Sequence, residues 1–237
     1  MPRDAALQAP ARSRAGAGWP GLVVFDCDGV LIDSEIVVCR LTAEELTRLG
    51  YAIATSEVIR RFAGRPEREM LAEIEAEWGR PVPAAYSAAM TARVAHAYAH
   101  ELQVMPGAAE LLRRLRVEVC VASSSHPEKL RLGLETVGLH DRFAPHVVSA
   151  SLVAHGKPAP DVFVFAAGWM RTPVAQCLVI EDSVPGVQAA RAAGMRVIGF
   201  AGGSHCGAGH GERLLAAGAE QVVARFEELD ALVPGAF

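Results

Sequence analysis

Four polar segments of this sequence could carry chemistry, although they lie far apart along the chain. They are Asp26-Cys27-Asp28, Ser123-Ser124-Ser125, Gly156-Lys157-Pro158 and Glu181-Asp182-Ser183. Carboxylates that crowd together repel one another unless a cation joins them, and oxygen ligands of this kind suit Mg²⁺. A lysine and a serine that point into the same space suit a phosphoryl group. Gathered at one point, the four segments predict Mg²⁺-assisted phosphoryl transfer to a carboxylate nucleophile.

A parallel β-sheet would gather these segments, because each follows a short apolar stretch. Strands are expected at 22–25, 117–122, 147–148, 177–180, 195–200 and 221–223. Helical patterns separate them at 108–115, 127–137, 160–169 and 185–193, after a first helix over 34–49 that stops at Gly50. This alternation predicts an α/β fold, a doubly wound, Rossmann-like parallel sheet with helices on both faces. Ligands of such a sheet bind beyond the carboxyl ends of its strands, where the four segments fall.

The stretch from 55 to 102 differs, because its apolar residues recur only at helical spacing. Thr55 or Ser56 is expected to cap one helix, and Pro66 to occupy the first turn of the next. We therefore expect an all-helical domain inserted into the sheet domain. The expected organisation is a disordered tail at 1–20, a core domain at 21–36 and 104–237, and a helical cap at 37–103.

Composition narrows the class of protein. The 237 residues are 51% hydrophobic and 21% charged, as in a globular protein with a full core, and no run is long enough for a membrane span. The net charge of −4 without a basic stripe argues against nucleic acid as a partner. Five cysteines without a C-x-x-C pair, and no apolar signal segment near the start, favour the cytoplasm. Only two of the 23 basic residues are lysines, Lys129 and Lys157. Each is a candidate functional residue, because arginine does not replace lysine where a compact charge is needed.

Two competing interpretations of the acidic and glycine-lysine motifs fail on spacing. A calcium loop that began at Asp26 would need Gly and Glu at its sixth and twelfth positions, where Leu31 and Val37 stand. A P-loop needs Gly-Lys followed by Ser or Thr, whereas Gly156-Lys157 is followed by Pro158.

A third feature, the glycine-rich stretch 202–211, contains His205, Cys206 and His210. These residue types can bind a metal, but no fourth ligand of fitting spacing follows them. We therefore expect a flexible polar loop here.

Taken together, the motifs resemble those of the haloacid dehalogenase-like (HAD) hydrolase superfamily. The segment Phe25-Asp26-Cys27-Asp28-Gly29-Val30-Leu31-Ile32-Asp33-Ser34-Glu35 is similar to the first motif. Ser123 matches the second, Lys157 in Gly-Lys-Pro-Ala-Pro-Asp the third, and Glu181-Asp182-Ser183-Val184-Pro185-Gly186 the fourth. The inserted helices resemble the cap of the β-phosphoglucomutase-like and sugar-phosphatase branch.

This resemblance implies a role for each motif residue. Asp26 would be the nucleophile that forms an aspartyl-phosphate, and Asp28 would protonate the leaving oxygen and then activate water. The phosphate group would be bound by Ser123, Ser124 and Lys157. The Mg²⁺ ion would be bound by Asp26, the Asp28 backbone carbonyl, Asp182 and Glu181. Because family dehalogenases lack an acid at the Asp28 position, the resemblance implies phosphate-ester chemistry.

To donate a proton to the leaving oxygen, Asp28 must have a pKa well above its ordinary value. An unperturbed Asp has a pKa of ~3.9, so a proton held near neutral pH requires that the pKa rise by ~3. We expect cap closure, which removes water and adds a neighbouring dianion, to raise it.

The cap is expected to choose the substrate. Gly64, Arg65, Glu67 and Arg68 lie where this branch carries its specificity loop. The β-phosphoglucomutases have an Arg where Glu67 stands, and Lys where His126 stands. Both differences favour a phosphatase acting on a phosphosugar, sugar-acid or polyol phosphate over a phosphosugar mutase, and a silent phosphometabolite-binding protein is a minor alternative. We expect a small phosphorylated metabolite as partner, and a monomer or weak homodimer.

Overall fold

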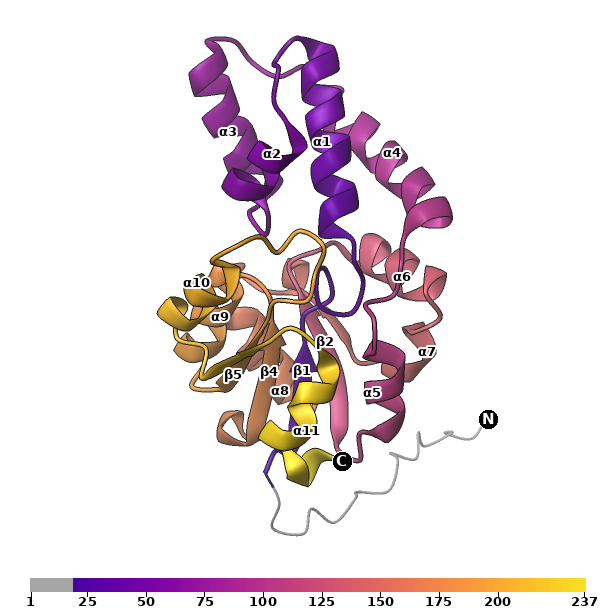
Figure 1. Cartoon of the computed structure of the whole chain (residues 1–237), viewed down its shortest axis with the longest axis vertical. Coiled ribbons are helices and arrows are strands. Elements are labelled where there is room, and N and C mark those ends of the chain that lie inside the picture. The colour runs from indigo at the N-terminus through magenta and orange to yellow at the C-terminus, as the bar shows by residue number, and fades with distance from the viewer. Residues whose placement is uncertain (1–18) are drawn as a thin grey trace, which may run out of the picture.

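The computed structural model describes residues 19–237, and Figure 1 shows their arrangement. Of the expected disordered tail at 1–20, residues 1–18 lie outside the described residues. Helices α1 to α4 form one end of the molecule, and the sheet with its flanking helices forms the other (Figure 1). Within residues 19–237, no helix is both long enough and apolar enough to cross a membrane.

The sheet has six strands in the order β3-β2-β1-β4-β5-β6, and every neighbouring pair is parallel. This confirms the predicted α/β fold with a doubly wound parallel sheet. The strands are β1 Leu22–Phe25, β2 Glu118–Ser123, β3 Val147–Ser149, β4 Cys177–Glu181, β5 Arg196–Phe200 and β6 Gln221–Val223.

The position of β1 at the centre of the sheet decides where the polar segments meet. Phe25, its last residue, is in register with Val121 of β2 on one side and Ile180 of β4 on the other. The three strands therefore end at nearly the same level, and the residues that follow them share one edge of the sheet.

Helices cover both faces of the sheet; the first four lie within two residues of their expected bounds, and the fifth had no expected bounds. They are α5 Ala108–Arg114, α6 Pro127–Thr136, α8 Asp161–Trp169, α9 Val184–Ala192 and α10 His210–Ala217. The sequence interpretation missed two short helices, α7 His140–Phe143 and α11 Leu229–Leu232. Short 3₁₀ turns occupy Ala150–Leu152, Val174–Gln176, Phe226–Glu228 and Pro234–Ala236.

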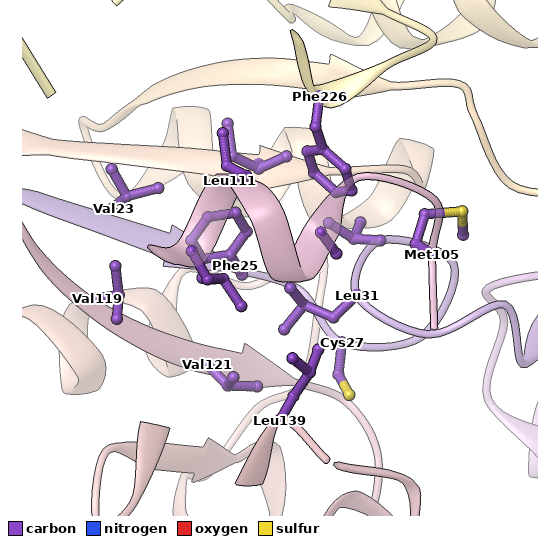
Figure 2. Close-up of a cluster of buried hydrophobic side chains, with 14 of the residues drawn as sticks. Val23, Phe25, Cys27, Leu31, Met105, Leu111, Val119, Val121, Leu139 and Phe226 are labelled. Atoms are coloured by element: carbon purple, nitrogen blue, oxygen red, sulfur yellow. The ribbon is translucent and has the colours of Figure 1, made fainter. Parts of the chain in front are cut away.

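Alternate residues of β1 enter two separate apolar layers. Val23 and Phe25 join one layer, in which Leu111, Val121 and Phe226 also lie (Figure 2). Leu22 and Val24 join the layer on the opposite face. Because the side chains of a strand alternate between the faces of its sheet, a strand buried on both faces is apolar throughout, as this one is.

The remaining helices, α1 Glu35–Leu49, α2 Thr55–Phe62, α3 Glu67–Trp78 and α4 Tyr86–Glu101, share a third apolar cluster of their own. Gly50 ends α1 as expected, with a left-handed φ of 102°. The expected caps of the next two helices are wrong by one residue. Ala54 precedes α2 without a side-chain cap, and Pro66 is the N-cap of α3 rather than part of its first turn. The division into a core and a cap at 37–103 stays a prediction.

Candidate active site

The site begins in the turn that follows β1. The amides of Val30, Leu31 and Ile32 all lie within 3.4 Å of the Cys27 carbonyl oxygen, to which they donate. Gly29 has φ +76°, and a Cβ at this position would overlap the Asp182 carboxylate. A glycine is therefore required both by the backbone conformation and by the close approach of Asp182. The turn is what brings Asp26 and Asp28 to the edge of the sheet.

Lys157 joins the ends of three strands. Its ammonium nitrogen donates to Asp26 Oδ1 at 2.7 Å, to Glu181 Oε1 at 2.8 Å and to the Ala122 carbonyl oxygen at 3.1 Å. The side chain is only 5% exposed. Burial opposes its charge, but Asp26 and Glu181 outweigh that effect and raise the pKa of Lys157. A fixed ammonium beside a carboxylate nucleophile can hold the anionic group that the nucleophile attacks.

Asp26, Glu181 and Asp182 form a buried acidic cluster in which the carboxylate oxygens lie within 4.8 Å of one another. Burial raises the pKa of Asp26; Glu181 and Asp182 raise it further, and Lys157 opposes them. Burial also raises the pKa of Glu181. Because the Lys157 ammonium and the His205 imidazole carry two positive charges against three carboxylates, the cluster favours an additional cation, and its all-oxygen donor set fits Mg²⁺.

Glu181 is held rigidly in this cluster. Its Oε2 accepts hydrogen bonds from the Ser183 amide at 2.7 Å and from the Ser183 hydroxyl at 2.9 Å. A Cβ at Gly186 would overlap the Glu181 carboxylate. The glycine of the fourth motif therefore makes room for the acidic side chain five residues before it.

The Asp28 carboxylate has its own set of hydrogen-bond and ion-pair partners, separate from those of Asp26. Its Oδ1 accepts from Ser34 Oγ at 2.6 Å and from Tyr98 at 3.3 Å, and lies 3.0 Å from Lys129 Nζ. Its Oδ2 accepts from Ser125 Oγ at 2.6 Å. Burial favours the neutral acid, but Lys129 and the hydroxyl groups outweigh it and lower the pKa of Asp28 to about 2. The rise of this pKa expected on cap closure around a bound dianion stays a prediction.

The sequence interpretation missed these partners of Asp28. Ser34 directly precedes α1, Tyr98 lies in α4, Ser125 lies in the loop after β2, and Lys129 lies in α6. One signal was available for Lys129, which is one of only two lysines in the chain and stands four residues after Ser125. Ser125 lies two residues before α6 and Lys129 in its first turn, where Lys129 Nζ donates to Ser125 Oγ at 3.1 Å.

The predicted phosphate-binding serines have different surroundings. Ser123 is buried, and its hydroxyl accepts from the Ser125 amide at 3.1 Å. Ser124 is exposed, and no side-chain hydrogen bond joins it to another residue of the segment 19–237. Ser125, which the prediction omitted, is the serine that reaches Asp28.

Of the predicted specificity residues, only Gly64 reaches the core. A Cβ on Gly64 would lie 3.1 Å from the Ser183 Cβ, and its amide donates to Glu35 Oε2 at 3.3 Å. The loop between α2 and α3 descends toward the core at this point (Figure 1). The loop therefore contacts the core through its backbone.

Two of the charged residues near this loop pair with side chains of α3 and α4. Arg65 donates to Glu73 Oε2 at 2.9 Å, and Glu67 Oε1 accepts from the Ser87 hydroxyl at 2.6 Å. Arg68 is exposed. Their roles in substrate choice stay predictions, and the structure gives no support for an electrostatic effect of Glu67 on the site.

The expectation of a flexible polar loop at 202–211 also needs correction, because the loop packs beside the acidic cluster. His205 is buried, and its Nε2 lies 3.1 Å from Asp182 Oδ2. Burial opposes protonation of this imidazole, but the hydrogen bond to Asp182 outweighs it and raises the pKa of His205 to about 11. A cationic imidazole therefore already faces one carboxylate of the cluster.

Comparison with known proteins identifies the family of this arrangement. A family model of haloacid dehalogenase-like hydrolases matches residues 20–194, which include all four motifs. The chain belongs to the haloacid dehalogenase-like hydrolases. This confirms the resemblance of the sequence motifs and the prediction of a hydrolase.

Individual HAD relatives are similar to this chain in sequence and in fold. The 6-phosphogluconate phosphatase of Escherichia coli K12 is 31% identical over 186 residues, which cover 77% of this chain and 83% of the relative. A HAD-like protein of Agrobacterium tumefaciens is 39% identical with a TM-score of 0.83, over 91% of this chain and 98% of that one. A HAD hydrolase of Deinococcus radiodurans, solved with phosphate and sodium, is 31% identical with a TM-score of 0.75. The match covers 91% of this chain and 96% of that one.

The partners of Asp28 generate a prediction on Lys129. In Lys129→Met the carboxylate loses its cation while its burial remains, so the pKa of Asp28 rises from about 2 to above its ordinary value. ¹³C NMR of the labelled carboxyl group, in metal-free protein, measures this change. Stability falls by about 1–3 kcal/mol near pH 7, and the loss shrinks as acid protonates Asp28.

Lys129→Arg serves as the control, because it keeps a positive charge near Asp28 and should keep the pKa low. An unchanged Asp28 titration in Lys129→Met would show that the hydroxyl groups alone hold the carboxylate ionised.

Proposed function

We propose that this chain is a Mg²⁺-dependent phosphatase that hydrolyses a small phosphate monoester through an aspartyl-phosphate at Asp26. The observation that carries the proposal is the placement of Asp26, with Lys157 on one oxygen and Glu181 and Asp182 beside it. A second carboxyl group, Asp28, lies two residues further on. The family of the chain and the phosphatase name of its E. coli relative support the same class of reaction.

The first step needs a free carboxylate oxygen. Lys157 holds Asp26 Oδ1, whereas Asp26 Oδ2 has no hydrogen-bond donor among residues 19–237. Oδ2 attacks phosphorus, the bond from phosphorus to the leaving oxygen breaks, and that oxygen takes a proton from Asp28. Lys157 stabilises the negative charge on the transferring group.

The second step reverses the role of Asp28. The Asp28 carboxylate takes a proton from a water molecule, the water oxygen attacks phosphorus, and the bond to Asp26 breaks with release of phosphate. Bound Mg²⁺, held by Asp26, Asp182 and the Asp28 backbone carbonyl with Glu181 beside them, would neutralise phosphate charge during both steps.

Asp28 must be protonated before the first step, although Lys129 and two serine hydroxyls hold it ionised here. A phosphate dianion bound beside Asp26 opposes the charge of Asp28 and so favours its protonation. The proton is thus acquired with the substrate, and the resting site keeps the carboxylate.

The substrate that we propose is a phosphosugar, sugar-acid phosphate or polyol phosphate. Hydroxyl groups of such a molecule could replace the Ser34, Ser125 and Tyr98 hydroxyl groups around Asp28, and an acidic end could bind Lys129. The mutase alternative lacks a lysine at position 126, where exposed His126 precedes α6. Glu67, which bonds Ser87 within the cap, no longer argues against it.

The nucleophile assignment predicts that Asp26→Asn lowers Mg²⁺-dependent hydrolysis of p-nitrophenyl phosphate by at least about 10³-fold. The amide neither attacks phosphorus nor ligates the metal as a carboxylate does. Steady-state turnover of the folded variant measures the effect, and the exposed Asp141→Asn is the matched control. Comparable turnover in Asp26→Asn and the wild type would refute the assignment.

Product analysis separates the phosphatase from the mutase. Incubation with β-glucose 1-phosphate and a catalytic amount of the 1,6-bisphosphate should release free phosphate. We expect this because a mutase must shield its phospho-aspartate from water while the bisphosphate intermediate turns, and tight anchoring of the second phosphate requires cations. Accumulation of glucose 6-phosphate faster than free phosphate would favour the mutase.

A further inference from the structure

The loop between β5 and α10 brings three soft-metal ligands together beside the acidic cluster. The metal-binding atoms of His205, Cys206 and His210 lie within 4.8 Å of one another. Cys206 Sγ is 3.5 Å from His205 Nε2, and the two imidazole rings lie 5.5 Å apart at an interplanar angle of 85°. Side chains placed edge to face around a thiol can direct their nitrogen atoms at a common point.

Asp182 lies against this cluster on its inner side. Its Oδ2 is 3.1 Å from His205 Nε2, and its carbonyl oxygen is 2.6 Å from His210 Nε2. The three loop residues and Asp182 therefore form a continuous group of two nitrogens, one sulfur and one carboxylate. Asp182, which directly follows β4, is the candidate for the fourth ligand that the sequence spacing did not supply.

The loop backbone is shaped to hold these side chains inward. A Cβ at Gly203 would lie 2.7 Å from the His205 ring, so a side chain at this position would displace the imidazole. Gly209 has a left-handed φ of 75° and starts α10 with His210 as its first residue. His205 is 5% exposed, whereas Cys206 and His210 are partly exposed, so an ion from solvent can reach the thiol first.

We propose that His205, Cys206 and His210 bind a soft divalent cation, Zn²⁺ in the first instance, with the Asp182 carboxylate as the fourth ligand. Imidazole and thiolate ligands select such ions over Mg²⁺, which prefers oxygen. Tetrahedral Zn²⁺ places its ligand atoms ~3.3–3.8 Å apart, so the three loop ligands, which lie within 4.8 Å of one another, must contract by at most ~1–1.5 Å while the Asp182 carboxylate moves toward them. On binding, His205 and His210 give up their contacts with Asp182, and the His205 imidazole and the Cys206 thiol each release a proton to solvent.

This site shares Asp182 with the Mg²⁺ site of the proposed function, and the consequence for activity rests on that proposal. A carboxylate drawn toward Zn²⁺ is a weaker ligand for Mg²⁺, so occupation of the soft site inhibits hydrolysis. Because binding at the two sites is linked, excess Mg²⁺ should relieve the inhibition.

Binding is tested first, without reference to activity. Metal-free full-length protein is titrated with Co²⁺, which reports a thiolate ligand by a charge-transfer band in the near ultraviolet. We expect one equivalent to give this band, and Cys206→Ser to lack it. Cys177→Ser, which removes a buried thiol at the start of β4, should retain it.

Isothermal titration with Zn²⁺ gives a second readout. We expect Cys206→Ser and His210→Gln each to weaken binding by at least about tenfold relative to Cys177→Ser. A missing thiolate band in the wild type, or equal Zn²⁺ affinity in Cys206→Ser and Cys177→Ser, would overturn the site. These outcomes stand even if the chain proves to have no phosphatase activity.

The linkage is tested by Zn²⁺ inhibition of p-nitrophenyl phosphate hydrolysis at several Mg²⁺ concentrations. Half-inhibition should need at least about tenfold more Zn²⁺ in Cys206→Ser than in Cys177→Ser, and should shift upward with Mg²⁺. Equal inhibition of the two variants would show that Zn²⁺ acts at the Asp26 cluster, and would overturn the proposed sharing of Asp182.

Discussion

The ammonium group of Lys157 is the interaction on which the rest of the site depends. It bonds Asp26, Glu181 and the Ala122 carbonyl, and thereby ties together the ends of β1, β4 and β2. Burial favours the neutral forms of these carboxylates and raises the pKa of Asp26, and Lys157 opposes that rise. The sheet order makes the contact possible, since β1 lies between β2 and β4 and all three strands run in the same direction.

A second lysine performs the corresponding task for Asp28, and the two ion pairs divide the chemistry. In the proposed mechanism, Lys157 holds Asp26 for attack, whereas Lys129 keeps Asp28 ionised until a substrate dianion changes its surroundings. The chain uses arginine at nearly every other basic position. A compact ammonium with rotatable donors fits the position of Lys157, whose side chain is only 5% exposed, because a planar guanidinium would need more room.

Much of the fold and the centre of the site could be predicted from local signals. The β1 sequence is apolar throughout because both its faces are buried, and the acidic motifs follow strands at the same sheet edge. The surroundings of Asp28 could not be predicted, because Tyr98 and Lys129 reach it across 70 and about 100 positions of the chain through helix packing. The loop 202–211 was misjudged for a similar reason: Asp182, the residue that completes its ligand group, lies outside the loop and was already assigned to another metal.

The central claim is that Asp26 carries the phosphoryl group, and chemical quench of the Asp28→Asn variant tests it most directly. This variant keeps the nucleophile and the backbone metal ligand but cannot activate water, so an aspartyl-phosphate should accumulate with p-nitrophenyl phosphate, whose leaving group needs little protonation. Acid quench and peptide mass mapping should find the mass of one phosphoryl group on the peptide that contains Asp26. An unmodified Asp26 peptide, or a phosphoryl group on another residue, during a measurable burst of p-nitrophenol would contradict the account.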